Sequence, residues 1–252
     1  MRLTILGCGT STGVPVIACR CGICTSTDAR NKRTRSSLLI EAGGRNILID
    51  TSTDLRTQSL ANNLSRIDAV LFTHPHADHI HGIDDLRAFN LAQGTSIPCY
   101  GSAFTIERIR VMFDYIFRDD LNDGWKPNLT TTVVDAPFDL SGVGITPVPV
   151  YHGQALIFGY RIKDMAYLTD CSSIPADSFG LLKGLDLLIL GALRHKPHPT
   201  HFSIDQAVDA SRAIKPRRTV LTHLSHGLDY PRDNPALPEG IELAYDGMRI
   251  EL

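Results

Sequence analysis

The sequence predicts an α/β protein in which two β-sheets pack together and helices lie outside them. Short apolar segments of strand length occur in both halves of the chain, and segments with helical spacing lie between them. This order is typical of layered α/β architectures. The 252 residues are 43% hydrophobic and 21% charged, which is enough apolar material for one large core. We therefore expect residues 1–252 to form a single domain.

The first half contains four apolar segments that are expected to form strands: 3–6, 36–41, 46–49 and 69–72. The second and third of these are expected to pair around Gly43-Gly44. Residues 104–117 carry apolar side chains at helical spacing, which predicts a helix. Residues 118–128 are polar and contain the single tryptophan, Trp125, so we expect an excursion on the surface.

The second half contains five more expected strands: 143–150, 156–161, 165–169, 185–190 and 218–222. Ser203 followed by Gln206 has the pattern of a capping box, which predicts a helix from there to Ile214. The chain is expected to close with a hairpin of residues 242–245 and 248–251, turned by Asp246-Gly247.

The net charge of the chain limits the classes of partner that it is expected to bind. The formal net charge is −2 and the pI is near 6.5, which argues against bulk electrostatic binding to nucleic acid or to an anionic membrane. The longest apolar run, around residues 187–190, is far too short to span a bilayer. The first seven residues lack the apolar segment of a signal peptide. We therefore expect a cytoplasmic protein with no membrane partner.

A dense group of ligand-type side chains follows the apolar segment at 69–72. His74, His76, Asp78 and His79 fall within six residues. So many polar groups at the end of a core strand need partners, and a metal ion supplies them. The spacing offers two ligand pairs, which suggests two metal ions rather than one. The alternative is an exposed histidine-rich loop without a role.

Four further residues of ligand type lie at the ends of apolar strands or just before the expected helix: His152, Asp170, His201 and His223. Each alone would more often be a surface residue than a ligand. Together with the motif at 74–79, they favour one convergent site.

The chain resembles the metallo-β-lactamase superfamily along essentially its whole length, through one ordered set of residues: His74, His76, Asp78, His79, His152, Asp170 and His223. The resemblance implies an αββα sandwich of two mixed sheets, with two divalent metal ions at one edge. An aspartate at position 170 points to phosphoester hydrolysis or glyoxalase-like chemistry rather than to antibiotic hydrolysis. Asp50 matches an aspartate that lies behind the ligands in this family, and its alternative role is to cap a following helix.

The same resemblance assigns the ligands to two ions. It implies that His74, His76 and His152 hold one ion. It implies that Asp78, His79 and His223 hold the other, and that Asp170 bridges the two. Neutral imidazoles leave the charge of the ions largely intact, so an anionic phosphodiester is favoured as substrate. Both Mn²⁺ and Zn²⁺ fit this mixed set of nitrogen and oxygen ligands.

A second candidate metal site is formed by cysteines. Cys19, Cys21 and Cys24 have the spacing of metal ligands. Three thiolates need a fourth ligand for tetrahedral Zn²⁺, and His226, three residues after His223, can supply it. This structural zinc would join the start of the chain to its end. The alternative is three structural or redox thiols without a metal.

Together the motifs resemble the PhnP-like branch, the phosphoribosyl 1,2-cyclic phosphate phosphodiesterase group, in these segments: 7–15, 19–24, 74–79, 201, 222–226 and 245–248. In that group the residue matching His201 is thought to contact phosphate or to protonate the leaving oxygen. The resemblance therefore implies catalytic roles for His201, Asp78 and Asp170. The basic segment of Arg194, His195, Lys196 and His198 is either a solvated loop or a phosphate-recognition loop.

The function implied by this resemblance is a dinuclear metal-dependent phosphodiesterase for a small cyclic phosphate ester, such as 5-phosphoribosyl 1,2-cyclic phosphate. The alternatives are a tRNase Z-like or cyclic-nucleotide phosphodiesterase, a glyoxalase-type thioester or lactone hydrolase, and a zinc protein without catalysis. The negative net charge argues against the nuclease, and the cysteine motif argues against the glyoxalase type. The family often forms homodimers, so a homodimer and a small phosphorylated substrate are the expected partners.

Overall fold

Two seven-stranded β-sheets form the centre of the computed structural model, which describes residues 1–118, 120 and 126–252. The order of the first sheet is β14 (Met248–Glu251), β1 (Arg2–Gly7), β2 (Ser37–Ala42), β3 (Arg45–Ile49), β4 (Ala69–Leu71), β5 (Ile97–Gly101) and β6 (Leu129–Val133). The order of the second is β13 (Ile241–Leu243), β12 (Arg218–Thr222), β11 (Leu187–Gly191), β10 (Met165–Leu168), β9 (Ala155–Ile162), β8 (Val143–His152) and β7 (Phe138–Leu140). Both sheets combine parallel and antiparallel pairs, as in the expected sandwich of mixed sheets.

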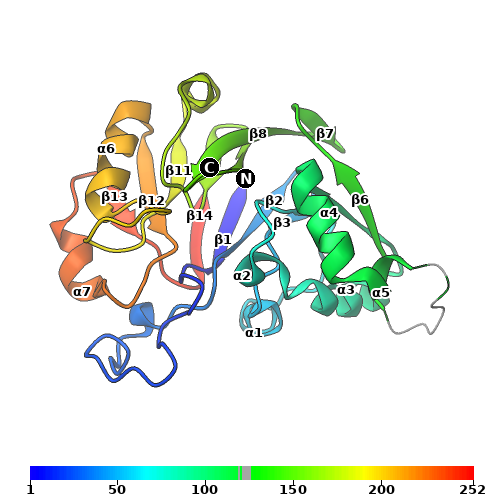
Figure 1. The fold of residues 1–252 in the computed structure, drawn as a ribbon, viewed down its shortest axis with the longest axis horizontal. Coiled ribbons are helices and arrows are strands. Elements are labelled where there is room, and N and C mark those ends of the chain that lie inside the picture. The colour runs from blue at the N-terminus through cyan, green and yellow to red at the C-terminus, as the bar shows by residue number, and fades with distance from the viewer. Residues whose placement is uncertain (119, 121–125) are drawn as a thin grey trace.

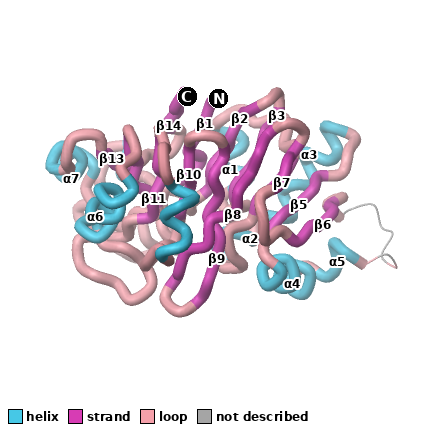
Figure 2. Tube along the Cα trace, turned by 90° about the horizontal axis from the view of Figure 1, so that it is seen from above, coloured by secondary structure: helices cyan, strands magenta, loops and turns pink. Residues whose placement is uncertain are grey.

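The helices lie outside the sheets (Figure 1). Five accompany the first sheet: α1 (Leu55–Ala61), α2 (Ala77–Ile80), α3 (Leu86–Gln93), α4 (Ala103–Met112) and α5 (Asp114–Phe117). Two accompany the second sheet: α6 (Ile204–Ile214) and α7 (Tyr230–Asp233). Seen from above, the strands occupy the middle of the molecule and the two termini lie side by side (Figure 2). The predicted α/β sandwich is therefore confirmed.

Alternation along the strands divides the core into two layers. In β2, Leu38 and Ile40 belong to the core between the sheets, whereas Leu39 belongs to the layer under the helices. In β3, Leu48 faces the helices in the same way. Because successive side chains of a strand point to opposite faces, a sheet covered on both sides must be apolar on both. This explains why the central strands are continuous apolar runs in the sequence.

The expected closing hairpin is wrong. β13 lies at the edge of the second sheet, parallel to β12, whereas β14 lies at the edge of the first sheet, antiparallel to β1. The connection between them crosses from one sheet to the other. The side chain of Asp246 accepts hydrogen bonds from Cys8 N at 3.0 Å and Thr34 N at 2.7 Å, and Gly247 N donates to Ile5 O at 2.7 Å. These bonds hold the turn against the first sheet, so the two strands cannot pair with each other.

The expected helix at 104–117 divides into α4 and α5. Phe113 leaves the helical conformation with φ −120° and ψ 44°, and its ring packs edge-on against His81. The capping box of Ser203 and Gln206 is present as predicted, and α6 ends at Ile214. Strands β5, β6 and β7 were not expected, because β5 contains a proline and β6 is largely polar. Most of the expected excursion at 118–128, including Trp125, lies outside the described residues.

Among the described helices, none has both the length and the apolar character that crossing a membrane requires.

Candidate dinuclear metal centre

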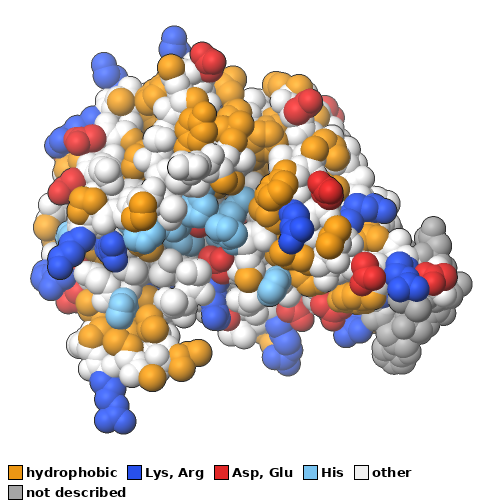
Figure 3. Space-filling view, viewed as in Figure 1, with side chains coloured by type: hydrophobic (Ala, Val, Ile, Leu, Met, Phe, Trp, Pro, Cys, Tyr) orange, Lys and Arg blue, Asp and Glu red, His pale blue; other side chains and the backbone are white. Residues whose placement is uncertain are grey.

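The candidate site lies at one edge of the sandwich, where several strands end. His152 is the last residue of β8, Asp170 follows β10, and His223 follows β12. His74 follows β4, and the next turn of chain, α2, carries Asp78 and His79. Histidine side chains gather in the hollow at the centre of one face of the molecule (Figure 3). The strand order therefore collects residues that are up to 149 positions apart in the sequence, as His74 and His223 are.

Three residues of the site have a backbone conformation that residues other than glycine rarely adopt. Asp50, Asp170 and His223 have φ values of 61°, 52° and 59°, in the left-handed region. Outside glycine this conformation costs of the order of 1 kcal/mol per residue. Asp50 and His223 directly follow β3 and β12, and Asp170 follows β10 after one intervening residue, so each lies in the turn by which the chain leaves the sheet edge. The surrounding fold therefore maintains an unfavourable backbone conformation at these three residues.

The ligand-type side chains form two sets, and in each set the candidate ligand atoms lie within 4.8 Å of one another. The first donor set comprises His74, His76, His152 and Asp170. The second donor set comprises Asp78, His79, Asp170 and His223. This is the grouping that the sequence resemblance implies.

Asp170 is shared by the two sets. Its Oδ2 lies 3.7 Å from His74 Nε2, and its Oδ1 lies 3.3 Å from His79 Nε2. The two oxygens of one carboxylate therefore face different donor sets, which is the position of a bridging ligand.

The donor chemistry fits divalent cations. Asp78 Oδ2 and His79 Nε2 are buried and lie 3.2 Å from each other, but among the described residues neither makes a hydrogen bond of good geometry. Buried polar atoms without a hydrogen bond are rare, because each costs about 1–3 kcal/mol. The opposite ring nitrogens are occupied: His79 Nδ1 lies 2.7 Å from Asp50 Oδ2, and His152 Nδ1 lies 2.8 Å from the carbonyl oxygen of Thr200. This arrangement leaves Nε2 of both imidazoles for a cation, as in known metal centres.

The carboxylates of the site are held ionised, whereas its imidazoles differ in charge. Burial alone would lower the pKa of His79, but the carboxylates of Asp170, Asp78 and Asp50 outweigh it and raise that pKa well above its usual value. Burial lowers the pKa of His74 well below its usual value and also lowers the pKa of His223. Burial alone would raise the pKa of Asp170, but the imidazoles of His223 and His79 outweigh it and hold the pKa well below its usual range. Neutral imidazole and ionised carboxylate are the forms that bind metal ions.

Asp50 lies behind the donor sets and caps no helix. It is fully buried and accepts hydrogen bonds from Thr73 N and Thr73 Oγ1, both at 2.8 Å, as well as facing His79 Nδ1. The following helix, α1, has Asp54 as its N-cap. Asp50 therefore fixes the orientation of the His79 ring instead of capping a helix.

His201 lies beside the donor sets without belonging to either. Its Nδ1 is 3.9 Å from Asp170 Oδ2, and its ring centroid is 4.7 Å from His152 and 5.0 Å from His223. Its side chain is 14% exposed. This position allows contact with a molecule that is bound at the donor sets. His81 is exposed and lies outside both sets.

Sequence reasoning missed the hydroxyl groups that hold the ligands. Thr73 Oγ1 lies 3.0 Å from His74 Nδ1, and Thr169 Oγ1 donates to Asp170 Oδ1 at 2.7 Å. Ser36 Oγ lies 3.2 Å from His223 Nδ1. The sequence carried a partial signal, since an apolar residue, a threonine and a candidate ligand occur in succession at 72–74 and 168–170. The same pattern at 221–223 gives no such bond, because the buried hydroxyl of Thr222 has no hydrogen-bond partner among the described residues.

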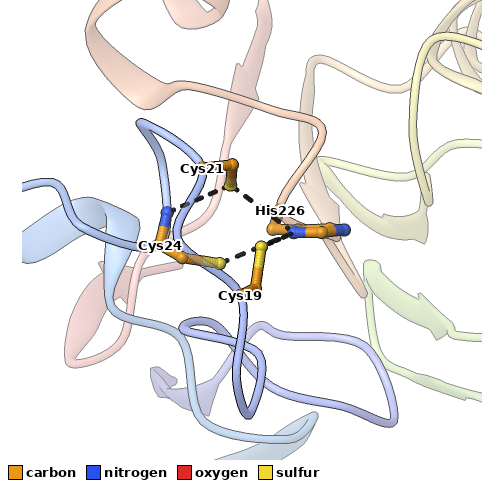
Figure 4. A group of neighbouring side chains, drawn as sticks. All are labelled: Cys19, Cys21, Cys24 and His226. Carbon is orange, nitrogen blue, oxygen red and sulfur yellow. Dashed lines mark hydrogen bonds between the residues drawn. The ribbon is translucent and has the colours of Figure 1, made fainter.

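The cysteine motif meets His226 as expected (Figure 4). The Sγ atoms of Cys19, Cys21 and Cys24 lie 3.4, 3.6 and 3.5 Å from His226 Nδ1. A tetrahedral zinc with bonds of about 2.3 Å to sulfur and about 2.0 Å to nitrogen separates these atoms by about 3.5 Å. The backbone N–H of Cys24 donates to Cys21 Sγ and lowers the pKa of that thiol to about 6, which favours thiolate. The four side chains thus fit a structural zinc.

Comparison with known proteins identifies the family. Residues 45–224 match the model of the Beta-lactamase superfamily domain. The chain belongs to this superfamily. A crystal structure described as a new diphosphatase from the PhnP family superposes with a TM-score of 0.93 at 42% identity, covering 100% of this chain and 97% of that one. The superfamily, this neighbour and the clustered histidines and aspartates together show a metal-dependent hydrolase.

Two other similar proteins have names that do not describe a phosphatase. An octanoyltransferase of Porphyromonas gingivalis is 40% identical over 98% of this chain, which spans about half (51%) of the length of that relative. The Zn²⁺-bound PqqB of Methylobacterium extorquens has a TM-score of 0.79 at 22% identity, with complete coverage of both chains, and so shares the fold.

Proposed function

We propose that this β-lactamase superfamily hydrolase is a dinuclear phosphodiesterase that acts on a small phosphate ester, such as 5-phosphoribosyl 1,2-cyclic phosphate. The observation that carries the proposal is the position of Asp170, whose two oxygens face two complete donor sets. The similarity to a PhnP-family diphosphatase supports phosphorus as the reacting centre. We further propose Mn²⁺ or Zn²⁺ in the two donor sets and Zn²⁺ at the cysteine motif.

The charge of the site supports an anionic substrate. Two divalent ions would bring four positive charges, and the carboxylates of Asp78 and Asp170 would cancel two, which leaves two. When bound, the ions supply Lewis acidity and a lowered pKa for water. The residues of the chain then hold the phosphate group between the donor sets and exclude other ligands from a site that is largely buried.

His201 is placed to act on the substrate itself. Hydrolysis forms one bond between phosphorus and the oxygen of water and breaks the bond between phosphorus and the leaving oxygen, which takes up a proton. The His201 ring lies within 5.0 Å of the His152 and His223 rings. We propose that it donates a hydrogen bond to a phosphoryl oxygen or a proton to the leaving oxygen.

Acyl transfer, the activity in the name of the Porphyromonas gingivalis relative, finds less support in this chain. Covalent acyl transfer needs an accessible activated nucleophile. The two cysteines nearest the site, Cys8 and Cys171, are fully buried, and burial raises the pKa of both thiols. A nuclease is also less well supported, because the net charge of −2 offers no basic surface excess for a polynucleotide.

The test is hydrolysis by Mn²⁺-loaded and Zn²⁺-loaded protein, followed by ³¹P NMR. The substrates are 5-phosphoribosyl 1,2-cyclic phosphate, a 2′,3′-cyclic nucleotide, a diphosphate diester and a precursor tRNA. We expect turnover of the ribosyl cyclic phosphate, or of the diphosphate diester, well above that of the tRNA. Turnover of a thioester or lactone without turnover of any phosphoester would overturn the proposal. Sedimentation of the same sample tests the homodimer, which we also propose.

A further inference from the structure

A third histidine extends the row of imidazoles at the site toward solvent. The His198 ring lies 5.1 Å from the His201 ring, which in turn stacks on His223 at 5.0 Å with an interplanar angle of 14°. His198 is half-buried, and it belongs to neither donor set. A molecule that is bound at Asp170 and touches His201 therefore has His198 as its next neighbour on this side.

Thr200 fixes the orientation of His198 and of the donor sets together. Its carbonyl oxygen faces His152 Nδ1 at 2.8 Å, while its N–H donates to His198 Nδ1 at 3.3 Å. Its hydroxyl lies 3.2 Å from the same nitrogen. Because His198 Nδ1 accepts a hydrogen bond, the neutral ring carries its proton on Nε2. His198 therefore presents an N–H donor whose place relative to His152 is set by one residue.

The charges around His198 are positive. Arg194 folds the loop by donating from Nε to the carbonyl oxygen of Lys196 at 3.1 Å and from Nη2 to that of Pro197 at 3.1 Å. Lys196, on the same loop, is exposed and adds a second positive charge to this segment. Arg194 is close enough to lower the pKa of His198, after the larger effect of burial. An N–H donor beside a guanidinium that is held in place suits an anion, and hydrogen bonds to charged oxygens are stronger than neutral ones.

We propose that His198 determines specificity by binding a second phosphoryl group of the substrate, adjacent to the phosphate held at Asp170. The inference rests on the proposed function for the position of the reacting phosphate. The ligand class is a phosphoester that carries another phosphate, joined through a sugar or an anhydride oxygen. His201 touches the reacting group, whereas His198 touches the remote one.

The test compares two substrates that differ by one phosphate: thymidine 5′-(4-nitrophenyl phosphate) and its 3′-phosphorylated form. In His198→Ala, we expect kcat/KM for the 3′-phosphorylated substrate to fall about tenfold or more, mainly through KM, because a remote ground-state contact is lost. The other substrate should change less than twofold. His198→Gln, whose amide can replace the Nε2–H donor, should restore most of the loss. His195→Ala is the matched control, since His195 lies on the same loop but pairs with Asp233 at 3.4 Å.

Two outcomes would overturn the proposal. An equal loss on both substrates would make His198 a structural or reaction-centre residue, and no loss on either would remove it from the binding site. If the wild type cleaves neither of these two esters, the proposed function is still decided by its own substrates, and the subsite is decided by binding. Calorimetric binding of thymidine 3′,5′-bisphosphate against thymidine 5′-phosphate then decides the subsite, which requires tighter binding of the bisphosphate in the wild type and equal binding in His198→Ala.

Discussion

At the scale of single residues, Asp170 is the group on which both donor sets depend. We expect Asp170→Asn to keep the side-chain volume but to remove the charge that the sets share. Turnover should fall by about three orders of magnitude or more, because both ions lose a ligand. Metal analysis should show a loss at the donor sets and retention of one zinc at the cysteine motif.

The control for this variant is Asp164→Asn, an aspartate whose side chain is 64% exposed. Its activity and metal content should match those of the wild type. Retained turnover in Asp170→Asn would contradict the bridging position.

Asp50 gives a second prediction at this scale, which concerns stability. It accepts from Thr73 N, Thr73 Oγ1 and His79 Nδ1 within 2.8 Å, and it is fully buried. An asparagine side chain has only one acceptor oxygen, and its NH₂ group would face the N–H and O–H groups that now donate to the carboxylate. We expect Asp50→Asn to lower the free energy of unfolding of the metal-free protein by about 2–4 kcal/mol, measured by urea titration. A loss below about 0.5 kcal/mol would mean that these bonds are replaced by others.

At the scale of elements, α6 shows what local sequence decides. Ser203 Oγ accepts from Gln206 N at 3.3 Å, and Gln206 Oε1 accepts from Ser203 N at 2.9 Å. Both bonds lie within four residues, so the sequence alone predicted them. We expect Ser203→Ala to cost about 1 kcal/mol, seen as a lower Tm. Gln206→Ala also removes one of the two bonds, but it should cost less, because the N-cap hydroxyl of Ser203 still accepts from the N–H of residue 206. An unchanged Tm in both variants would show that the box contributes nothing.

The elements that were predicted wrongly depend on distant contacts. Residues 242–251 have the local pattern of a hairpin, but Asp246 bonds to Cys8 and Thr34, more than 200 residues away. The break between α4 and α5 at Phe113 coincides with a ring contact to His81, from another element. Local pattern cannot supply either partner. The candidate metal ligands, in contrast, could be selected from the sequence because their side-chain types are unusual at strand ends, and the structure brings them together in two donor sets.

At the scale of the whole molecule, the sequence predicted that distant segments converge but not how the fold holds them. Arg33 is almost fully buried and donates to the carbonyl oxygens of Ser225 and Leu228, both at 2.9 Å. Asn31 donates to Asp229 at 2.7 Å. Nothing in the sequence marks an arginine as buried, because this residue type is almost always exposed. The segment after the cysteine motif is therefore joined to the chain near His226 by polar contacts as well as by the proposed zinc.

The cysteine motif leads to the last prediction, which separates stability from catalysis. Cys24 and His226 are 202 residues apart, and a cross-link that closes so long a loop stabilises the folded chain by a few kcal/mol. His226→Ala should therefore release one zinc and lower the Tm by several degrees.

His223 is held separately from the cysteine motif, since Leu224 N donates to Cys8 O at 2.8 Å and Thr10 N donates to Leu224 O at 3.2 Å. The folded variant should thus keep kcat within about threefold at low temperature. His81→Ala, at an exposed histidine outside both donor sets, is the control: it should leave the zinc content unchanged and lower the Tm only slightly, through the lost contact with Phe113. Loss of zinc with an unchanged Tm would show that Arg33 and Asn31 hold the two segments without a metal.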